Sequence, residues 1–373
     1  MVQMKKMNNM ISDEKYLIIL ASRKTMNEKI KNEIKEIVEK DIDWELVLKY
    51  SYRNKVTALV FYNIENVAGE NIIPNYLKKL LSDYRYCNVL RNNTKLEELK
   101  KIVSILEQKN VKVLPVKGAY MIDNIYCDRS VRITNDMDVL IRKKDISIIE
   151  KTMENLGYTN GFYNTDAGDI ELPSSVKRML YKTKMYNLIP FTKIVDREMG
   201  NVVTLDFSFA MDFNLDTTPV EELINQSKMV HGIWRCAPEL YFIHMCCHHY
   251  REASHVAWFK IGSDLNLIKF CDVRELVLQK MDEKAKENAI EFAKKYGLEK
   301  AIYFTLYYLK AIYNDGYEDE LMKKLNIENN DFIFEYSDGR ETMKRKKEFW
   351  NSFFDENNKD EITQESKYEE LMV

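Results

Sequence analysis

Hydrophobic residues recur at helical spacing along the first hundred residues of the chain. Ile30, Ile34 and Ile37 lie three or four positions apart, and Leu, Ile and Val follow the same period from Leu96 to Gln108. This period places apolar side chains on one face of a helix. The pattern predicts a run of helices from about residue 12 to residue 109.

The pattern changes after Asn110. Val111–Val116 is rich in Val and Leu and ends at Lys117-Gly118, which predicts a buried strand followed by a tight turn. A short helix is expected next, from Ala119 to Tyr126. Its free N–H groups would point at the turn, an arrangement that favours an anion.

Two acidic residues begin the next predicted strand. In DMDVLI, Asp136 and Asp138 are two positions apart, so their carboxylates leave the same face of a strand. Neighbouring carboxylates repel and need a compensating cation, for which a divalent ion with oxygen ligands is suitable. Each feature alone is common, but a turn that favours phosphate beside a carboxylate pair is typical of metal-assisted nucleotidyl transfer.

The following segment predicts a helix and a hairpin. Asp145 is expected to cap a helix that ends at Gly157, and residues 161–176 read as an irregular surface loop. Two strands, Lys184–Phe191 and Asn201–Phe209, are expected to form an antiparallel hairpin.

Asp206 lies in the second hairpin strand. Alternation places Asp206 on one face with Thr204 and Ser208, whereas Val203 and Leu205 face the core. Plain solvent exposure would give the same polar face, so the residues alone leave both interpretations open.

The chain becomes helical again after Pro219. Pro238-Glu239 opens a helix, and Trp258, Ile261, Leu265 and Ile268 predict the apolar face of the next. A long apolar helix is expected over Ala301–Tyr313. The basic residues near Lys344 predict a solvated helix face, and the charged tail beyond them is expected to be disordered at its end.

The composition is that of a globular protein. The chain has 373 residues, 45% hydrophobic and 31% charged, with 56 basic and 59 acidic side chains and a net charge of -3. This is typical of a globular protein with more than one packed unit. The net charge does not favour binding to nucleic acid, and it does not exclude a local basic groove on the surface.

Cysteine usage and hydropathy indicate a cytoplasmic protein. The six cysteines include no CxxC pair, which fits reduced thiols better than a disulfide framework. We see no signal-peptide core, and no apolar run approaches the ~20 residues of a membrane helix.

The run VKGAYMIDNIYCDRSVRITNDMDVLIRKKDISIIEKTMENLGY resembles the uncharacterised nucleotidyltransferase family of bacteria, a branch of the DNA polymerase beta-like nucleotidyltransferase superfamily. The matching pieces are Lys117-Gly118, Tyr126 and Asp128, Arg132 four positions before Asp136, the DMDVLIR strand, and Leu156-Gly157-Tyr158. The resemblance extends weakly from about residue 43 to residue 272. The superfamily usually has Gly-Ser where this chain has Lys-Gly, so the serine hydroxyl that would contact phosphate is missing.

The resemblance implies transfer of a nucleoside monophosphate from an NTP to an acceptor (a small molecule, peptide or protein). Asp136, Asp138 and Asp206 would hold two Mg²⁺ or Mn²⁺ ions. Lys117 and the Gly118 amide would steady the triphosphate, and Arg132 would pair with phosphate or support the Asp strand. Two alternatives remain: an inactive relative kept as a binding or scaffold module, and an RNA-directed transferase.

The stretch HMCCHHYREASH raises the question of zinc. His244 and His248 would share one helix face, but no glutamate follows the first histidine and no third ligand is evident. A histidine-rich helix packed on the core, with one or two histidines lining the cleft, is the better interpretation.

The expected fold is α+β, with a minimal nucleotidyltransferase core and a small mixed sheet flanked by helical regions. The expected divisions are an N-terminal helical region (1–95), the core (96–216), a C-terminal helical domain (217–343) and a charged tail (344–373).

Overall fold

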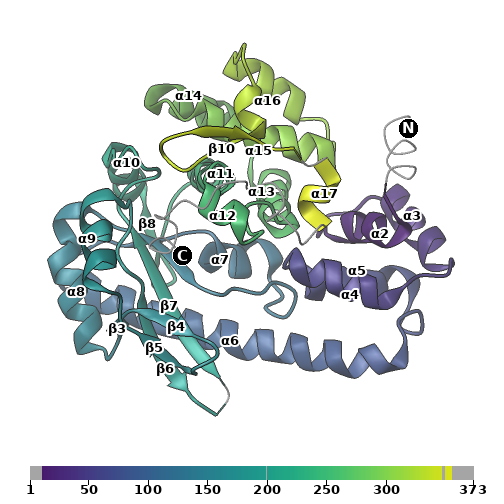
Figure 1. Cartoon of the computed structure of the whole chain (residues 1–373), viewed down its shortest axis with the longest axis horizontal. Helices are drawn as coiled ribbons and strands as arrows, with labels where there is room; N and C mark the ends of the chain where they lie inside the picture. The colour runs from purple at the N-terminus through teal and green to yellow at the C-terminus, as the bar shows by residue number, and fades with distance from the viewer. Residues whose placement is uncertain (1–10, 199, 347–348, 355–373) are drawn as a thin grey trace.

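The computed structural model describes residues 11–198, 200–346 and 349–354 (Figure 1). It confirms an α+β fold in which helices flank a small mixed sheet. The N-terminal helices are α2 (Asp13–Ala21), α3 (Glu28–Val38), α4 (Trp44–Arg53), α5 (Thr57–Ala68) and the long α6 (Asn75–Gln108). The side chain of Asp43 caps α4 by accepting hydrogen bonds from the amides of Glu45 and Leu46.

The largest sheet in the described part of the chain has five strands and lies to one side of the molecule (Figure 1). Its order is β1 (Leu114–Pro115), β2 (Met137–Leu140), β7 (Asn201–Ser208), β6 (Phe191–Asp196) and β3 (Thr159–Asn160). Only β2 and β7 run parallel; the other neighbouring pairs are antiparallel. The parallel pair therefore brings together two segments that are about seventy residues apart in sequence.

Apolar side chains of the sheet pack against α6 and α8 (Ile146–Asn155). Met137, Val203, Leu205 and Phe207 are fully buried in one cluster with the second half of α6. Because the apolar residues of β7 alternate, Asp206 is left on the opposite face, as the sequence predicts.

The C-terminal region is helical. Its helices are α10 (Thr218–Gln226), α11 (Pro238–Ala253), α12 (Val256–Lys260), α13 (Leu267–Lys280), α14 (Glu283–Tyr296), α15 (Glu299–Ile312), α16 (Glu318–Leu325) and α17 (Phe349–Phe354). Small hairpins join β4 (Phe162–Asn164) to β5 (Asp169–Glu171), β8 (Lys228–Val230) to β9 (Ile233–Arg235), and β10 (Glu335–Ser337) to β11 (Thr342–Lys344). The 3₁₀ segments are η2 (Lys143–Asp145) and η3 (Asp331–Phe334).

Five local expectations were wrong. Residues 161–176 are not one irregular loop, because they contain the β4–β5 hairpin and the start of α9 (Ser175–Lys184). The first strand of the predicted hairpin begins at Phe191, seven residues later than expected. Trp258 and Ile268 lie on separate helices, with Ile261 exposed between them.

The fourth wrong expectation concerns the basic segment near Lys344. It continues from β11, and the side chain of Arg345 is buried in an ion pair with Asp264 rather than solvated on a helix. The fifth concerns Asp145, which precedes α8 as expected but forms no side-chain capping bond. The predicted disorder of the tail end concerns residues 355–373, outside the described part.

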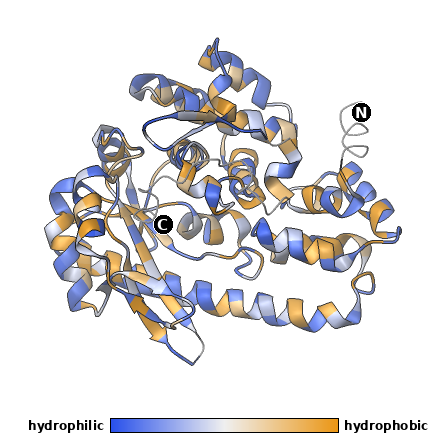
Figure 2. Cartoon of the chain, viewed as in Figure 1, coloured by the Kyte–Doolittle hydropathy of each residue, from blue (hydrophilic) through white to orange (hydrophobic). Residues whose placement is uncertain are grey.

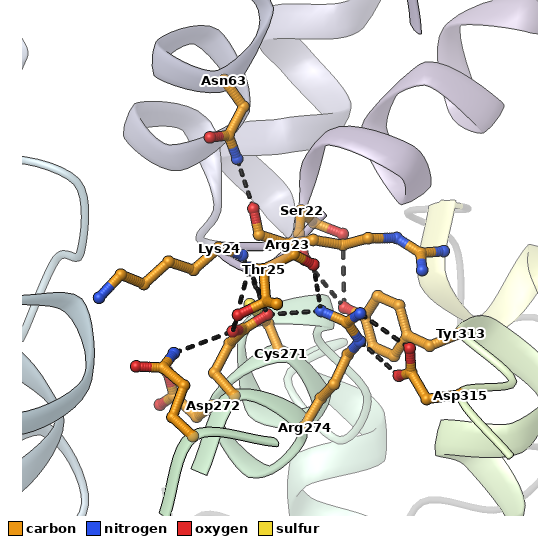
Figure 3. Close-up of polar contacts among 12 residues, drawn as sticks. Ser22, Arg23, Lys24, Thr25, Asn63, Cys271, Asp272, Arg274, Tyr313 and Asp315 are labelled. Atoms are coloured by element: carbon orange, nitrogen blue, oxygen red, sulfur yellow. Dashed lines mark hydrogen bonds and ion pairs between the residues drawn. The ribbon is translucent and has the colours of Figure 1, made fainter. Parts of the chain in front are cut away.

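A second, larger apolar cluster joins the N-terminal helices to the C-terminal helices. In Figure 2, apolar and polar residues alternate along the helices of both regions. Hydrogen bonds also link the two regions. Glu275 is fully buried and accepts hydrogen bonds from the amides of Lys24 and Thr25 at 3.0–3.2 Å. Figure 3 shows the 22–25 segment lying over Arg274, which donates to the carbonyl oxygen of Thr25.

None of the helices in the described ranges is both long enough and apolar enough to cross a lipid bilayer.

Candidate functional site

The parallel pairing of β2 and β7 places two of the predicted carboxylates side by side. Asp138 and Asp206 occupy the same register on neighbouring strands, which lie about 4.8 Å apart in a sheet. Asp136 immediately precedes β2 and its side chain is exposed. The structure therefore brings the three acidic residues to one place, although Asp206 is distant from the other two in sequence.

The surroundings of Asp138 and Asp206 disfavour the charged forms of these two carboxylates. Burial, together with repulsion from Asp136 and Asp206, raises the pKa of Asp138 to about 7 even though Lys117 opposes the shift. Burial also raises the pKa of Asp206, against a hydrogen bond in which Asn187 donates to its Oδ1 at 2.9 Å. The site thus carries more negative charge than its buried positions favour.

Lys117 supplies the nearest positive charge. Its Nζ lies 2.7 Å from Oδ1 of Asp138, and both side chains are mostly buried. Burial lowers the pKa of Lys117, but the carboxylates of Asp138, Asp136 and Glu252 outweigh burial and raise it, so the ammonium is charged. Lys117 has φ 47°, a left-handed conformation that is unfavourable for a residue with a side chain and that often occurs at functional sites.

Polar groups of the C-terminal helices are buried beside Lys117. Nζ of Lys117 lies 2.8 Å from Nε2 of His248, which lies 3.0 Å from Oε1 of Glu252; the other oxygen of Glu252 pairs with Lys269 at 2.5 Å. Burial lowers the pKa of His248 well below its usual value. The neutral ring of His248 accepts a hydrogen bond from Arg251 at Nδ1 (2.7 Å), so its own proton lies on Nε2. Nε2 therefore donates a hydrogen bond to Glu252.

Arg132 is fixed by the helical region rather than free for a ligand. Its guanidinium forms a two-pronged ion pair with Asp272 of α13, with contacts of 3.1 and 2.5 Å. The hydroxyl of Tyr126 donates to the same carboxylate at 2.8 Å. This ion pair ties the loop before Asp136 to α13, and Arg132 also contributes to the lining of the cavity over the site.

Gly118 begins α7 (Gly118–Met121), which continues as the π-helix η1 (Ile122–Tyr126). A Cβ atom at Gly118 would lie 2.8 Å from Cγ2 of Thr134 and 3.0 Å from Nη1 of Arg132. Only glycine therefore allows the turn to pack against the loop that carries Asp136.

A cavity of about 160 Å³ lies over this arrangement. The core contributes Lys117, Asp136 and Asp138 to its lining, and α13 contributes Lys269 and Asp272. Asp206 is not part of the lining, so the structure separates it slightly from the other predicted residues.

The sequence indicated some residues of the site and not others. His248 lines the cavity, and one or two histidines of its segment were expected to do so. Glu252 follows it by four positions on α11, a spacing that could have indicated a shared helix face. Lys269 and Asp272 gave no local signal, because only the packing of α13 on the core makes them part of the site.

The carboxylate oxygens at this site are metal ligands of the kind that Mg²⁺ prefers. Within residues 11–198, 200–346 and 349–354, however, no three His, Cys, Asp or Glu side chains are arranged to hold a metal ion. The Lys117 ammonium instead compensates Asp138. The excess of buried negative charge fits a cation, and Lys117 would have to share or release Asp138 to admit one.

Comparison with known proteins gives one assignment. No curated protein and no solved structure shows significant similarity to the chain. A family model described as "Uncharacterised nucleotidyltransferase" matches residues 40–314, about three quarters of the sequence and the whole of the site described above. The chain belongs to this uncharacterised nucleotidyltransferase family.

Proposed function

We propose that this protein transfers a nucleoside monophosphate from an NTP to an acceptor (a small molecule, peptide or protein), with release of pyrophosphate. The observation that carries the proposal is the register of Asp138 and Asp206 on adjacent parallel strands, with Asp136 beside them. The family name supports a nucleotidyl transfer.

Asp136, Asp138 and Asp206 would hold the divalent cation, Mg²⁺ or Mn²⁺. Such ions neutralise phosphate charge and lower the pKa of the attacking group. Asp206 has a raised pKa and is oriented by Asn187, which suits a carboxylate that draws a proton from the acceptor. Lys117 and the Gly118 amide would steady the phosphates once the cation has reached Asp138.

Calorimetry with Mn²⁺ and a non-hydrolysable NTP tests the site without knowledge of the acceptor. The wild type should bind Mn²⁺ more tightly when the NTP is present, since its phosphates supply further oxygen ligands. The Asp136→Asn/Asp138→Asn variant should lose this coupling. Identical titrations of the two proteins would refute the assignment of the metal ligands.

A screen with the four NTPs, each labelled at the α-phosphate, tests the reaction itself. Pyrophosphate release or self-labelling that depends on Mg²⁺ and disappears in Asp138→Asn would support transfer.

A second candidate is a binding or scaffold protein without activity. The ion pair between Lys117 and Asp138 favours it, because a lysine already satisfies a carboxylate that the reaction would need. Tight NTP binding with no metal coupling and no turnover would identify this candidate.

A further inference from the structure

The charged side chains around the cavity pair with one another, with two exceptions. Lys117 pairs with Asp138, Arg132 with Asp272, and Lys269 with Glu252. These pairs leave Asp136 and Lys55 as the charged lining residues that have no ion-pair partner among the described residues. Asp136 comes from the core, whereas Lys55 comes from the N-terminal helices.

Lys55 lies in the turn between α4 and α5, and its side chain is exposed. Its φ of 58° is in the left-handed region, where a residue with a Cβ atom is unfavourable and glycine or asparagine is usual. Backbone strain of this kind persists only where the surrounding structure enforces it.

The neighbouring residues do enforce it. The carbonyl oxygen of Arg53 accepts from Nδ2 of Asn266 at 3.1 Å, and Oδ1 of Asn54 accepts from the amide of Leu267 at 3.1 Å. Nδ2 of Asn54 donates to the carbonyl oxygen of Phe353 at 3.1 Å. The turn is thereby held on the start of α13, the helix that carries Lys269 and Asp272.

Lys55 and Lys269 also converge. The two ammonium groups are close enough for the charge of Lys55 to contribute to lowering the pKa of Lys269, behind the larger effect of burial. Two like charges that face one cavity repel, and an anion between them would relieve the repulsion. The ion pair of Lys269 with Glu252 makes Lys55 the cation available to that anion.

We infer that Lys55 binds the triphosphate of the nucleotide and that the N-terminal helical region thereby contributes to the nucleotide site. This inference rests on the proposed function. It also divides the phosphate contacts between two lysines: Lys117 steadies the phosphates beside the carboxylates, and Lys55 meets the phosphate charge at the mouth of the cavity.

The variant Lys55→Gly separates the charge from the backbone. Glycine accepts a φ of 58° without strain, so the variant should fold with an unchanged or higher melting temperature. Its affinity for a non-hydrolysable NTP should fall about 5- to 20-fold, as expected for loss of a charged hydrogen-bond donor at an exposed position. Its affinity for the corresponding nucleoside monophosphate should change by less than about twofold.

Two further variants and one further ligand make the test specific. Lys55→Arg should retain most of the NTP affinity, and Lys79→Met, at an exposed lysine of α6 away from the cavity, should bind as the wild type does. Inorganic tripolyphosphate should show the same dependence on Lys55 as the NTP.

Wild-type NTP affinity in Lys55→Gly would overturn the inference and leave the proposed function intact. A wild type that binds neither an NTP nor tripolyphosphate would overturn both.

Discussion

The ammonium of Lys117 lies 2.7 Å from the carboxylate of Asp138, and both groups are largely removed from solvent. The residue expected to meet phosphate is thus paired with a residue expected to bind metal. Lys117 compensates a buried charge in the unliganded protein, and its left-handed backbone brings the side chain to that position.

The first prediction concerns the contribution of this ion pair to the stability of the fold. Lys117→Met removes the cation that opposes protonation of Asp138, so the buried carboxyl should bind a proton near pH 8, and the loss of the contact should cost about 1–3 kcal/mol of unfolding free energy. Lys117→Met/Asp138→Asn removes both charges and should recover much of the loss. Urea unfolding of the four proteins of this cycle measures the coupling, and additive effects would show that the contact contributes little.

The second prediction concerns pH. Asp138 has a pKa of about 7 in the folded protein and a lower ordinary value of 3.8, so the folded state binds its proton more tightly than the unfolded state does. The resulting stability is present at acid pH and is lost as the pH rises through about 7. The unfolding free energy of the wild type relative to Asp138→Asn should therefore fall by a few kcal/mol between about pH 5 and pH 8. Parallel curves for the two proteins would contradict the raised pKa.

The third prediction concerns the contact between Arg132 and Asp272, which ties the Asp136 loop to α13. Arg132→Ala leaves Asp272 buried and uncompensated and should destabilise the protein by about 3–5 kcal/mol. Arg132→Lys should rescue it only partly, because an ammonium cannot reproduce the two-pronged geometry.

An exposed ion pair provides the control for this prediction. Lys310→Met breaks the pair between Lys310 and Asp319 and should cost less than about 1 kcal/mol. Thermal or urea unfolding distinguishes the two cases. Equal losses at the two sites would mean that burial of the Arg132 pair is unimportant.

The fourth prediction concerns the close approach at Gly118. Gly118→Ala places a methyl group 2.8 Å from Cγ2 of Thr134 and should destabilise the fold by about 1–3 kcal/mol. Adding Thr134→Ser removes that Cγ2 and retains the hydroxyl that accepts from Arg132 at 2.8 Å. The double variant should be more stable than Gly118→Ala alone; a double variant that is no better would locate the strain elsewhere.

Much of the fold was predictable from local patterns. The N-terminal helices and the buried alternation of β7 follow from residue periodicity. The exceptions, such as the late start of β6 at Phe191, are short segments in which few residues carry the pattern. There the pairing with β7, rather than the local sequence, sets the ends of the strand.

The candidate site, too, was only partly predictable from the sequence. The carboxylates at 136 and 138 and the glycine turn could be identified along the chain, because they lie within about twenty residues of one another and have a recognisable spacing. Asp206 required the resemblance to a family, because Thr204 and Ser208 make the same polar alternation as an exposed strand.

The pairing of the charged residues at the site depends on how the helices pack. Glu252, Lys269 and Asp272 lie more than a hundred residues after Lys117 and Arg132, and no pattern along the chain links them. The packing of α11 and α13 on the core forms these ion pairs, because a buried charge is stable only beside an opposite charge. Lys55 has no ion-pair partner among the residues that the structure describes, and the contact of its turn with α13, not its local sequence, places it at the cavity.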